Sequence, residues 1–239
     1  MSRHVILTRE EHAGLRVSTE HSAELGDAVQ ASFTVPLEFR RIQHDFPILF
    51  RRDPGTGRFS ALALLGFEAG ENLYLDGNSW IADYKPLALA VQPFLVGRSK
   101  DDDAPIQLHI DLDHPRISTA GEGVLLFDSG GRPTPFLEKI GEMLAELDGG
   151  YRQSASFFAA LDRYELLEPF ALDIELGDGT QHRMVGYHLI NEDRLRGLDP
   201  ENVAELHSEG HLMPIFMAIA SLSNLPKLIG RKRLRDSNG

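Results

Sequence analysis

The sequence contains no cysteine, and this absence removes several kinds of chemistry at once. Disulfide frameworks, thiolate metal sites and cysteine nucleophiles all need a thiol. Of the 239 residues, 42% are apolar, a share too high for an intrinsically disordered chain. We therefore expect a folded protein, and the length is compatible with a single domain spanning residues 1–239.

Long apolar runs are also missing. The longest, residues 212–222, contains Pro214 and Ser221 and is far shorter than the roughly 20 residues that span a bilayer. We predict a buried helix there and no transmembrane segment. Near the start of the sequence, Arg9, Glu10 and Glu11 occupy the place where a secretory signal would have an apolar stretch. The expected location is therefore cytoplasmic.

Positive charge is scarce except at the C-terminal end. The formal net charge is -12, and five cations are gathered in the last 13 residues: Lys227, Arg231, Lys232, Arg233 and Arg235. An acidic protein repels the phosphate backbone, so we expect no general nucleic-acid binding. For the basic tail, residues 231–239, we predict a solvated, frayed terminus; the alternative is contact with an anionic membrane surface or an acidic partner.

The first 130 residues show short strand patterns separated by turns. Strands are expected at residues 46–50, 59–65, 73–75, 106–110 and 124–127. The turns between them are expected at Asp53–Gly57, which separates the first two strands, and at Asp76–Asn78. Residues 36–42 begin with a proline and predict one or two helical turns.

After residue 130 the apolar period becomes helical. One helix is predicted from Thr134 to Gly149-Gly150, and a second from residue 154 to 167, ended by Pro169. Residues 170–176 and 181–190 alternate around Asp178-Gly179 and predict a hairpin. Asn191 and Asp199 are expected helix caps, and Gly210 an expected helix end. The predicted fold class is α+β, strand-rich in residues 1–130 and helix-rich in residues 131–230, with an inserted β-hairpin; residues 98–105 are the only linker-like segment.

Several catalytic signatures are absent. The sequence has no G-x-x-x-x-G-K-[ST], no H-E-x-x-H and no G-x-S-x-G. Gly55-Thr56-Gly57 and Gly177-Asp178-Gly179 lack the third glycine of a dinucleotide fingerprint and are predicted to be turns. No cofactor is expected.

One segment nevertheless gathers metal-ligand residue types. On a strand, His109 and Asp111 share a face, and with a distant His182 or His188 they would form the ligand set of a non-heme iron oxygenase. The alternative is ordinary strand alternation, with His182 opposite Glu175 in the hairpin. His207 and His211 have i, i+4 spacing, but Gly210 between them is expected to end the helix and separate them.

A stretch of turns between residues 72 and 94 is rich in aromatics and prolines. Such residues in loops can line a binding groove, and the alternative is the packing of an irregular lobe. The predicted binding residues are Asn72, Tyr74, Trp80, Tyr84, Pro86, Pro93 and Phe94.

The order and spacing of short motifs resemble the bacterial SapC family. The motifs include Phe46-Pro47-Ile48-Leu49-Phe50, Leu64-Leu65-Gly66-Phe67, Glu71-Asn72-Leu73-Tyr74, Trp80, Tyr84-Lys85-Pro86, Pro93-Phe94, Leu125-Leu126-Phe127, Leu166-Leu167-Glu168-Pro169, Asp178-Gly179, Gly186-Tyr187, Gly210-His211-Leu212 and Ser221-Leu222-Ser223-Asn224-Leu225. Family members usually carry a basic pair and an aromatic before the Pro-Phe, whereas this chain has Ala90, Val91 and Gln92.

The resemblance implies a bacterial accessory protein without established catalytic residues. It links the chain to surface-layer assembly or TonB-dependent uptake. The expected bound species is a peptide, a small molecule or a partner protein, such as a tryptophan-halogenase-like protein. We expect a non-catalytic accessory or binding protein. The alternatives are the iron-dependent oxygenase and a structural subunit that oligomerises through residues 212–222.

Overall fold

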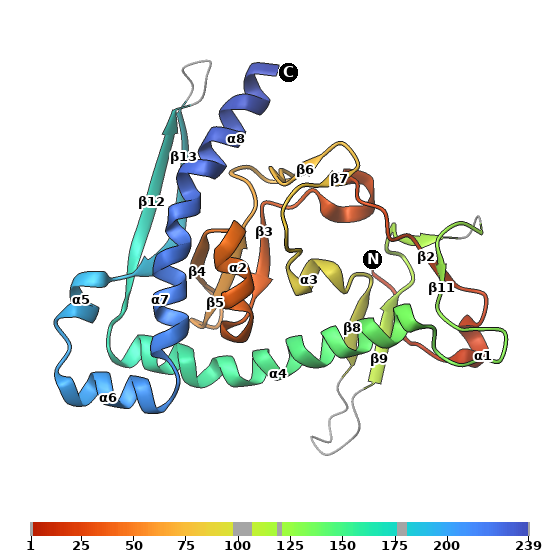
Figure 1. The fold of residues 1–239 in the computed structure, drawn as a ribbon, viewed down its shortest axis with the longest axis horizontal. Helices are drawn as coiled ribbons and strands as arrows, with labels where there is room; N and C mark the ends of the chain where they lie inside the picture. The colour runs from red at the N-terminus through yellow and green to blue at the C-terminus, as the bar shows by residue number, and fades with distance from the viewer. Residues whose placement is uncertain (1, 98–106, 119–120, 176–180, 239) are drawn as a thin grey trace. The chain divides into compact units, whose positions relative to one another are not determined.

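The computed structural model describes residues 2–97, 107–118, 121–175 and 181–238, and its fold is α+β as predicted (Figure 1). Two compact units share the chain. Unit 1 contains residues 1–28, 75–80 and 87–149, and unit 2 contains residues 29–74, 81–86 and 150–239. Residues 98–105, the predicted linker, lie outside the described residues.

Unit 1 contains two three-stranded antiparallel sheets and, in residues 75–80, an antiparallel pair of short strands. In one, β9 (Gln107–Asp111) lies between β1 (His4–Ile6) and β8 (Phe94–Gly97); in the other, β2 (Arg16–Val17) pairs with β10 (Ile117–Ser118) and β11 (Val124–Leu125). The remaining elements of this unit are α1 (Arg9–His12), η1 (Ala23–Asp27), β6 (Leu75–Asp76), β7 (Ser79–Trp80), α3 (Leu87–Ala90) and the first half of α4 (Pro135–Arg163). Its core joins Val17, Phe94, Ile110 and Leu126 to Leu137, Ile140 and Leu144 of α4.

A buried ion pair crosses unit 1. The Arg116 guanidinium donates to both carboxylate oxygens of Asp27, over 2.8 and 2.7 Å. The two side chains are 4% and 0% exposed. Arg116 also donates to the backbone oxygens of Ser18 and Glu20, so one side chain ties η1 and the segment before it to the loop after β9.

Unit 2 is built on a five-stranded antiparallel sheet of order β12-β13-β4-β5-β3. Its strands are β3 (Ala31–Thr34), β4 (Ile48–Arg52), β5 (Phe59–Leu64), β12 (Leu167–Glu175) and β13 (Gln181–Ile190). The helices are η2 (Pro36–Glu38), α2 (Phe39–Asp45), the second half of α4, α5 (Glu192–Arg196), α6 (Pro200–Ser208), α7 (Leu212–Ser221), η3 (Leu222–Asn224) and α8 (Leu225–Asn238). Phe39, Phe50 and Phe157 pack ring against ring in the core.

The β4–β5 hairpin confirms the prediction from the turn residues. Asp53 accepts hydrogen bonds from the amides of Gly55 and Thr56 and from the Thr56 hydroxyl, which fixes the turn. The turn at Gly77, with φ +56°, likewise joins β6 to β7 as predicted.

The prediction that a helix stops at Gly149-Gly150 is wrong. Helix α4 runs unbroken through both glycines for 29 residues and ends at Arg163, before the left-handed Glu165. Pro169 does not end a helix either; it lies in β12, an edge strand, where a missing N–H is tolerated. Close packing explains Gly150, because a Cβ there would lie 2.5 Å from Val35 Cγ2.

The adjacent glycines Gly149 and Gly150 of α4 are expected to respond oppositely to alanine. Gly150→Ala should lower the free energy of unfolding by about 1–3 kcal/mol, because the methyl group overpacks against Val35. Gly149→Ala should raise it by up to about 1 kcal/mol, since no atom lies within 4 Å of the added Cβ and alanine favours helix. Urea unfolding of both variants checks this, and a shift of the same sign in both would contradict it.

The register of the β12–β13 hairpin differs from the prediction. Ile174 pairs with His182 and Glu175 pairs with Gln181, so His182 does not lie opposite Glu175. The sequence-based count assumed a two-residue turn at Asp178-Gly179, which lies outside the described residues. The pairing places five residues between the strands, and this odd number shifts the register by one.

The helical segment at the C-terminus is longer than the apolar run of residues 212–222. Leu212–Ser237 form 26 helical residues whose most apolar window has a mean hydropathy of 1.5. Only a third of that window is buried, and Met213 and Phe216 are 57% and 54% exposed. By length and composition this helix could cross a membrane, a test that core helices of soluble proteins also pass. The expectations of no transmembrane segment and of self-association through residues 212–222 stay predictions.

Candidate functional site

Tyr74 and Asn72, two predicted binding residues, are buried in unit 2. The Tyr74 hydroxyl donates to the backbone oxygen of Asp45 over 2.6 Å, and its ring packs edge-on against Phe46. Burial raises the pKa of Tyr74, so its hydroxyl stays protonated. Asn72 accepts a hydrogen bond from the Tyr74 amide. Both side chains therefore have packing roles.

Tyr84 is half-buried and belongs to a second hydrogen-bond network in unit 2. Its hydroxyl donates over 2.8 Å to Glu38, a fully buried carboxylate. The other oxygen of Glu38 accepts from the Thr34 hydroxyl over 2.7 Å. The Arg41 guanidinium lies 5.1 Å from the centre of the Tyr84 ring. These contacts fix the segment 81–86 against α2.

The other predicted binding residues divide between the units. Pro86 is buried in unit 2, whereas Trp80, Pro93 and Phe94 belong to unit 1. Trp80 is half-buried beside His21, Pro93 follows a cis peptide bond, and Phe94 is a core residue. A binding role for these seven residues stays a prediction.

The prediction of a frayed terminus is wrong for the described part of the basic tail, residues 231–238, which is helical. This part forms the end of α8, and Lys232 is buried against three carboxylates, those of Glu71 at 2.9 Å, Asp236 at 3.2 Å and Glu68 at 3.3 Å. These hydrogen bonds and charges outweigh burial and raise the pKa of Lys232. These contacts could not be predicted from the sequence, because the partners of Lys232 in residues 68–71 are remote along the chain.

The neighbours of Lys232 bind the same loop. Arg235 donates to the backbone oxygen of Asn72 over 2.9 Å, and the Arg231 guanidinium lies 4.6 Å from the centre of the Tyr74 ring. Arg231, Lys232 and Arg235 therefore hold residues 68–74.

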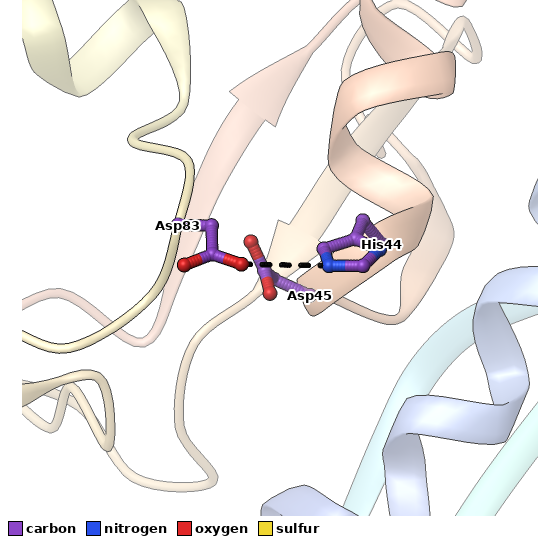
Figure 2. Close-up of side chains that lie close together, drawn as sticks. All are labelled: His44, Asp45 and Asp83. Carbon is purple, nitrogen blue, oxygen red and sulfur yellow. Dashed lines mark ion pairs between the residues drawn. The ribbon is translucent and has the colours of Figure 1, made fainter.

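One group of three metal-ligand residue types lies in unit 2. Figure 2 shows His44 and Asp45 at the end of α2 beside Asp83, with an ion pair of 3.5 Å between His44 and Asp83. Within the described residues this is the single such group, with all donor atoms within 4.8 Å of one another. Asp45 also accepts from the Tyr84 amide. The side chains of His44 and Asp83 are 72% and 87% exposed, and an exposed ion pair accounts for their approach.

The residues of the oxygenase hypothesis have other partners. The Asp111 carboxylate accepts from the amides of Arg3 and Asp113, and the His109 ring occupies the space that a side chain at Gly97 would fill. His188, in unit 2, packs edge-on against Phe59 at 5.0 Å, and burial together with Arg52 lowers its pKa. The side chain of His182 lies outside the described residues.

The pair His207 and His211 does not share a helix, as expected. Helix α6 ends at Ser208 and Gly210 has a left-handed φ of +77°. His211 is buried, packs against Phe157, and lines a hollow of about 450 Å³. Its Nε2 atom lies 3.3 Å from a Glu209 oxygen without a hydrogen bond.

A larger groove, of about 790 Å³, lies in unit 2 between the β4–β5 hairpin and the second half of α4. One wall comes from the sheet and hairpin and the other from successive turns of the helix. We call it the Arg–aromatic groove; its lining residues include Phe33, Arg52, Asp53, Arg58, Phe59, Tyr151, Arg152, Ala155, Phe158, Ala159 and Asp162. Its size falls within the range of small-molecule sites, about 300–1,000 Å³.

The second wall of the groove is formed by one face of α4. Tyr151, Ala155, Ala159 and Asp162 recur at intervals of three and four, so they share one face of α4. The alanines leave room that larger side chains would fill. Tyr151 is 55% exposed, and its ring centre lies 6.0 Å from that of Phe33 on β3.

No local sequence pattern predicts this groove. Its two walls lie about 100 residues apart, and each has a local explanation, a turn on one side and helix periodicity on the other. The available signal was the concentration of arginines at positions 51, 52 and 58 in an otherwise acidic chain.

Comparison with known protein families gives a match over most of the chain. The family described as SapC matches residues 7–228, which covers parts of both units and every residue of the groove. No curated protein and no solved structure matches the chain.

Proposed function

The chain belongs to the SapC family, and from that premise we propose that it is a non-catalytic accessory protein that binds a ligand in the Arg–aromatic groove. The observation that supports this proposal is the groove itself, which combines a volume suited to a small ligand with aromatic and cationic walls. The wider role, in bacterial surface assembly or TonB-dependent uptake with a tryptophan-halogenase-like partner, follows from the family resemblance and is part of the proposal.

The lining of the groove favours binding without conversion. Its acidic side chains are Asp53 and Asp162, and Asp53 already accepts three hydrogen bonds from its own turn. Two of its hydroxyl groups already donate hydrogen bonds, that of Ser154 to the backbone oxygen of Gly150 over 2.7 Å and that of Thr56 to Asp53. The bonds within the turn lower the pKa of Asp53, which makes its carboxylate a weak base toward the Thr56 hydroxyl.

The test is a ligand-observed NMR screen with a mixed set of acidic, neutral and basic aromatic fragments. We expect binding that is lost in Ala155→Trp, because an indole there fills the groove from the exposed face of α4. Ala145→Trp is the matched control, since Ala145 is exposed on the same helix and does not line the groove. Thermal melting of both variants monitors folding.

Mass spectrometry of the bound fragment after long incubation separates binding from catalysis. Recovery of the fragment unchanged supports the proposal. Equal binding by wild type and Ala155→Trp would place the ligand elsewhere and overturn the groove as the site, and a chemically altered fragment would overturn the non-catalytic role.

A further inference from the structure

We propose that the Arg–aromatic groove selects a small organic anion, a carboxylate carried on an aromatic body. This inference rests on the proposed function and adds the chemical class of the ligand. Three features carry it: arginines available at the mouth of the groove, an acidic neighbour whose charge is already engaged, and aromatic walls separated by small residues.

Arg58 and Arg52 supply the donors. The Arg58 guanidinium is exposed and makes no hydrogen bond or ion pair within residues 2–97, 107–118, 121–175 and 181–238. Arg52 uses its Nε to donate to the Gly57 backbone oxygen over 2.9 Å, and its guanidinium lies 5.6 Å from the centre of the Phe59 ring. These two contacts orient Arg52, and its two terminal nitrogens make no hydrogen bond within the same described part. A planar guanidinium with free donors matches the two oxygens of a carboxylate.

Asp53, the acidic residue next to Arg52, does not compete with an anionic ligand for these arginines. The Asp53 carboxylate accepts three hydrogen bonds from its own turn, to the amides of Gly55 and Thr56 and the Thr56 hydroxyl. The same bonds lower the pKa of Asp53. The turn therefore holds this negative charge in place. Arg52, Arg58 and Arg152 outnumber Asp53 and Asp162 around the groove, in a chain whose net charge is -12.

The aromatic walls select the body of the ligand. Phe33 and Tyr151 face the groove from β3 and α4, and Phe59 and Phe158 add two further rings. Ala155 and Ala159 lie between them on α4 and leave a slot beside the rings. A flat aromatic ligand gains edge-to-face or offset contacts in such a slot. A long polyanion is disfavoured because the surrounding chain is acidic.

The test uses isothermal titration calorimetry with naphthalene-2-carboxylate and its neutral counterpart naphthalene-2-carboxamide. We expect wild type to bind the carboxylate at least tenfold more tightly than the amide. Arg58→Gln and Arg52→Gln should each weaken carboxylate binding about tenfold and leave amide binding unchanged, because each removes a charged donor and keeps the walls.

Arg51→Gln is the matched control. Arg51 precedes Arg52 on β4, so strand alternation directs its side chain to the opposite face of the sheet, and it does not line the groove. We expect its binding to equal that of wild type. If Arg52→Gln loosens the turn, as thermal melting would reveal, Arg58→Gln decides the question alone.

The outcomes separate this inference from the proposed function. Equal affinity for carboxylate and amide, or unchanged carboxylate binding in Arg58→Gln, overturns the anion selection and leaves a binding role in place. Failure of both compounds to bind overturns the selection of aromatic carboxylates; the fragment screen then decides the binding role independently.

Discussion

Arg116→Met is expected to lower the free energy of unfolding by about 3–5 kcal/mol. The substitution leaves the Asp27 carboxylate, which is 0% exposed, without its cation, and removal of one partner from a buried ion pair costs about that much. It also removes the two hydrogen bonds to the backbone oxygens of Ser18 and Glu20. Urea unfolding monitored by circular dichroism measures the change.

The matched control for Arg116 is Arg132→Met. Arg132 forms an ion pair of 2.9 Å with Asp128, but its side chain is 83% exposed, so we expect a loss below about 1 kcal/mol. The double variant Asp27→Ala, Arg116→Met should recover part of the loss, because no unpaired charge then remains buried. Equal losses in Arg116→Met and Arg132→Met would show that burial of the pair is not what matters.

Lys232→Met is expected to cost about 2–4 kcal/mol of unfolding free energy. The lysine is the shared cation of Glu68, Glu71 and Asp236, and without it the nearly buried Glu71 carboxylate loses its ionic partner. The cost lies below that of a fully buried pair because Glu68 and Asp236 are 45% and 25% exposed and regain water. Denaturant unfolding measures the loss.

Arg233→Met provides the comparison for Lys232. Arg233 is the next residue and is exposed, and its side chain has no ion pair or hydrogen bond to another described residue, so its replacement should change stability by less than about 0.5 kcal/mol. Glu71→Gln combined with Lys232→Met should be more stable than Lys232→Met alone. A negligible effect of Lys232→Met would contradict the role assigned to α8 in holding residues 68–74.

Features encoded by neighbouring residues were predictable. Asp53–Gly57 predicts the β4–β5 hairpin because both the aspartate and the glycines act within the turn itself. Asn191 predicts a helix start because its side chain accepts from the Arg194 amide, three residues on. The family resemblance was likewise visible, since it rests on motifs read in order along the chain.

Features set by distant contacts were not predictable. The glycine at position 150 of α4 is explained by Val35, which follows β3 and lies so close that a Cβ would not fit. No local pattern reveals this contact. Lys232 and Glu71 are 161 residues apart, so the basic C-terminal segment resembled a solvated tail. The groove has the same origin, because its arginines and its alanines belong to segments whose individual patterns are ordinary.

The division of the chain has a consequence at the level of the gene. Each unit is assembled from three separate stretches of sequence, so the chain passes from one unit to the other five times. No truncation at a single codon isolates either unit, and neither corresponds to a contiguous reading frame that could have been acquired by end-to-end fusion. Family members are therefore expected to gain or lose sequence within loops and not by dropping one unit, and separate expression of unit 2 would require rejoining its segments in a new order or with new linkers.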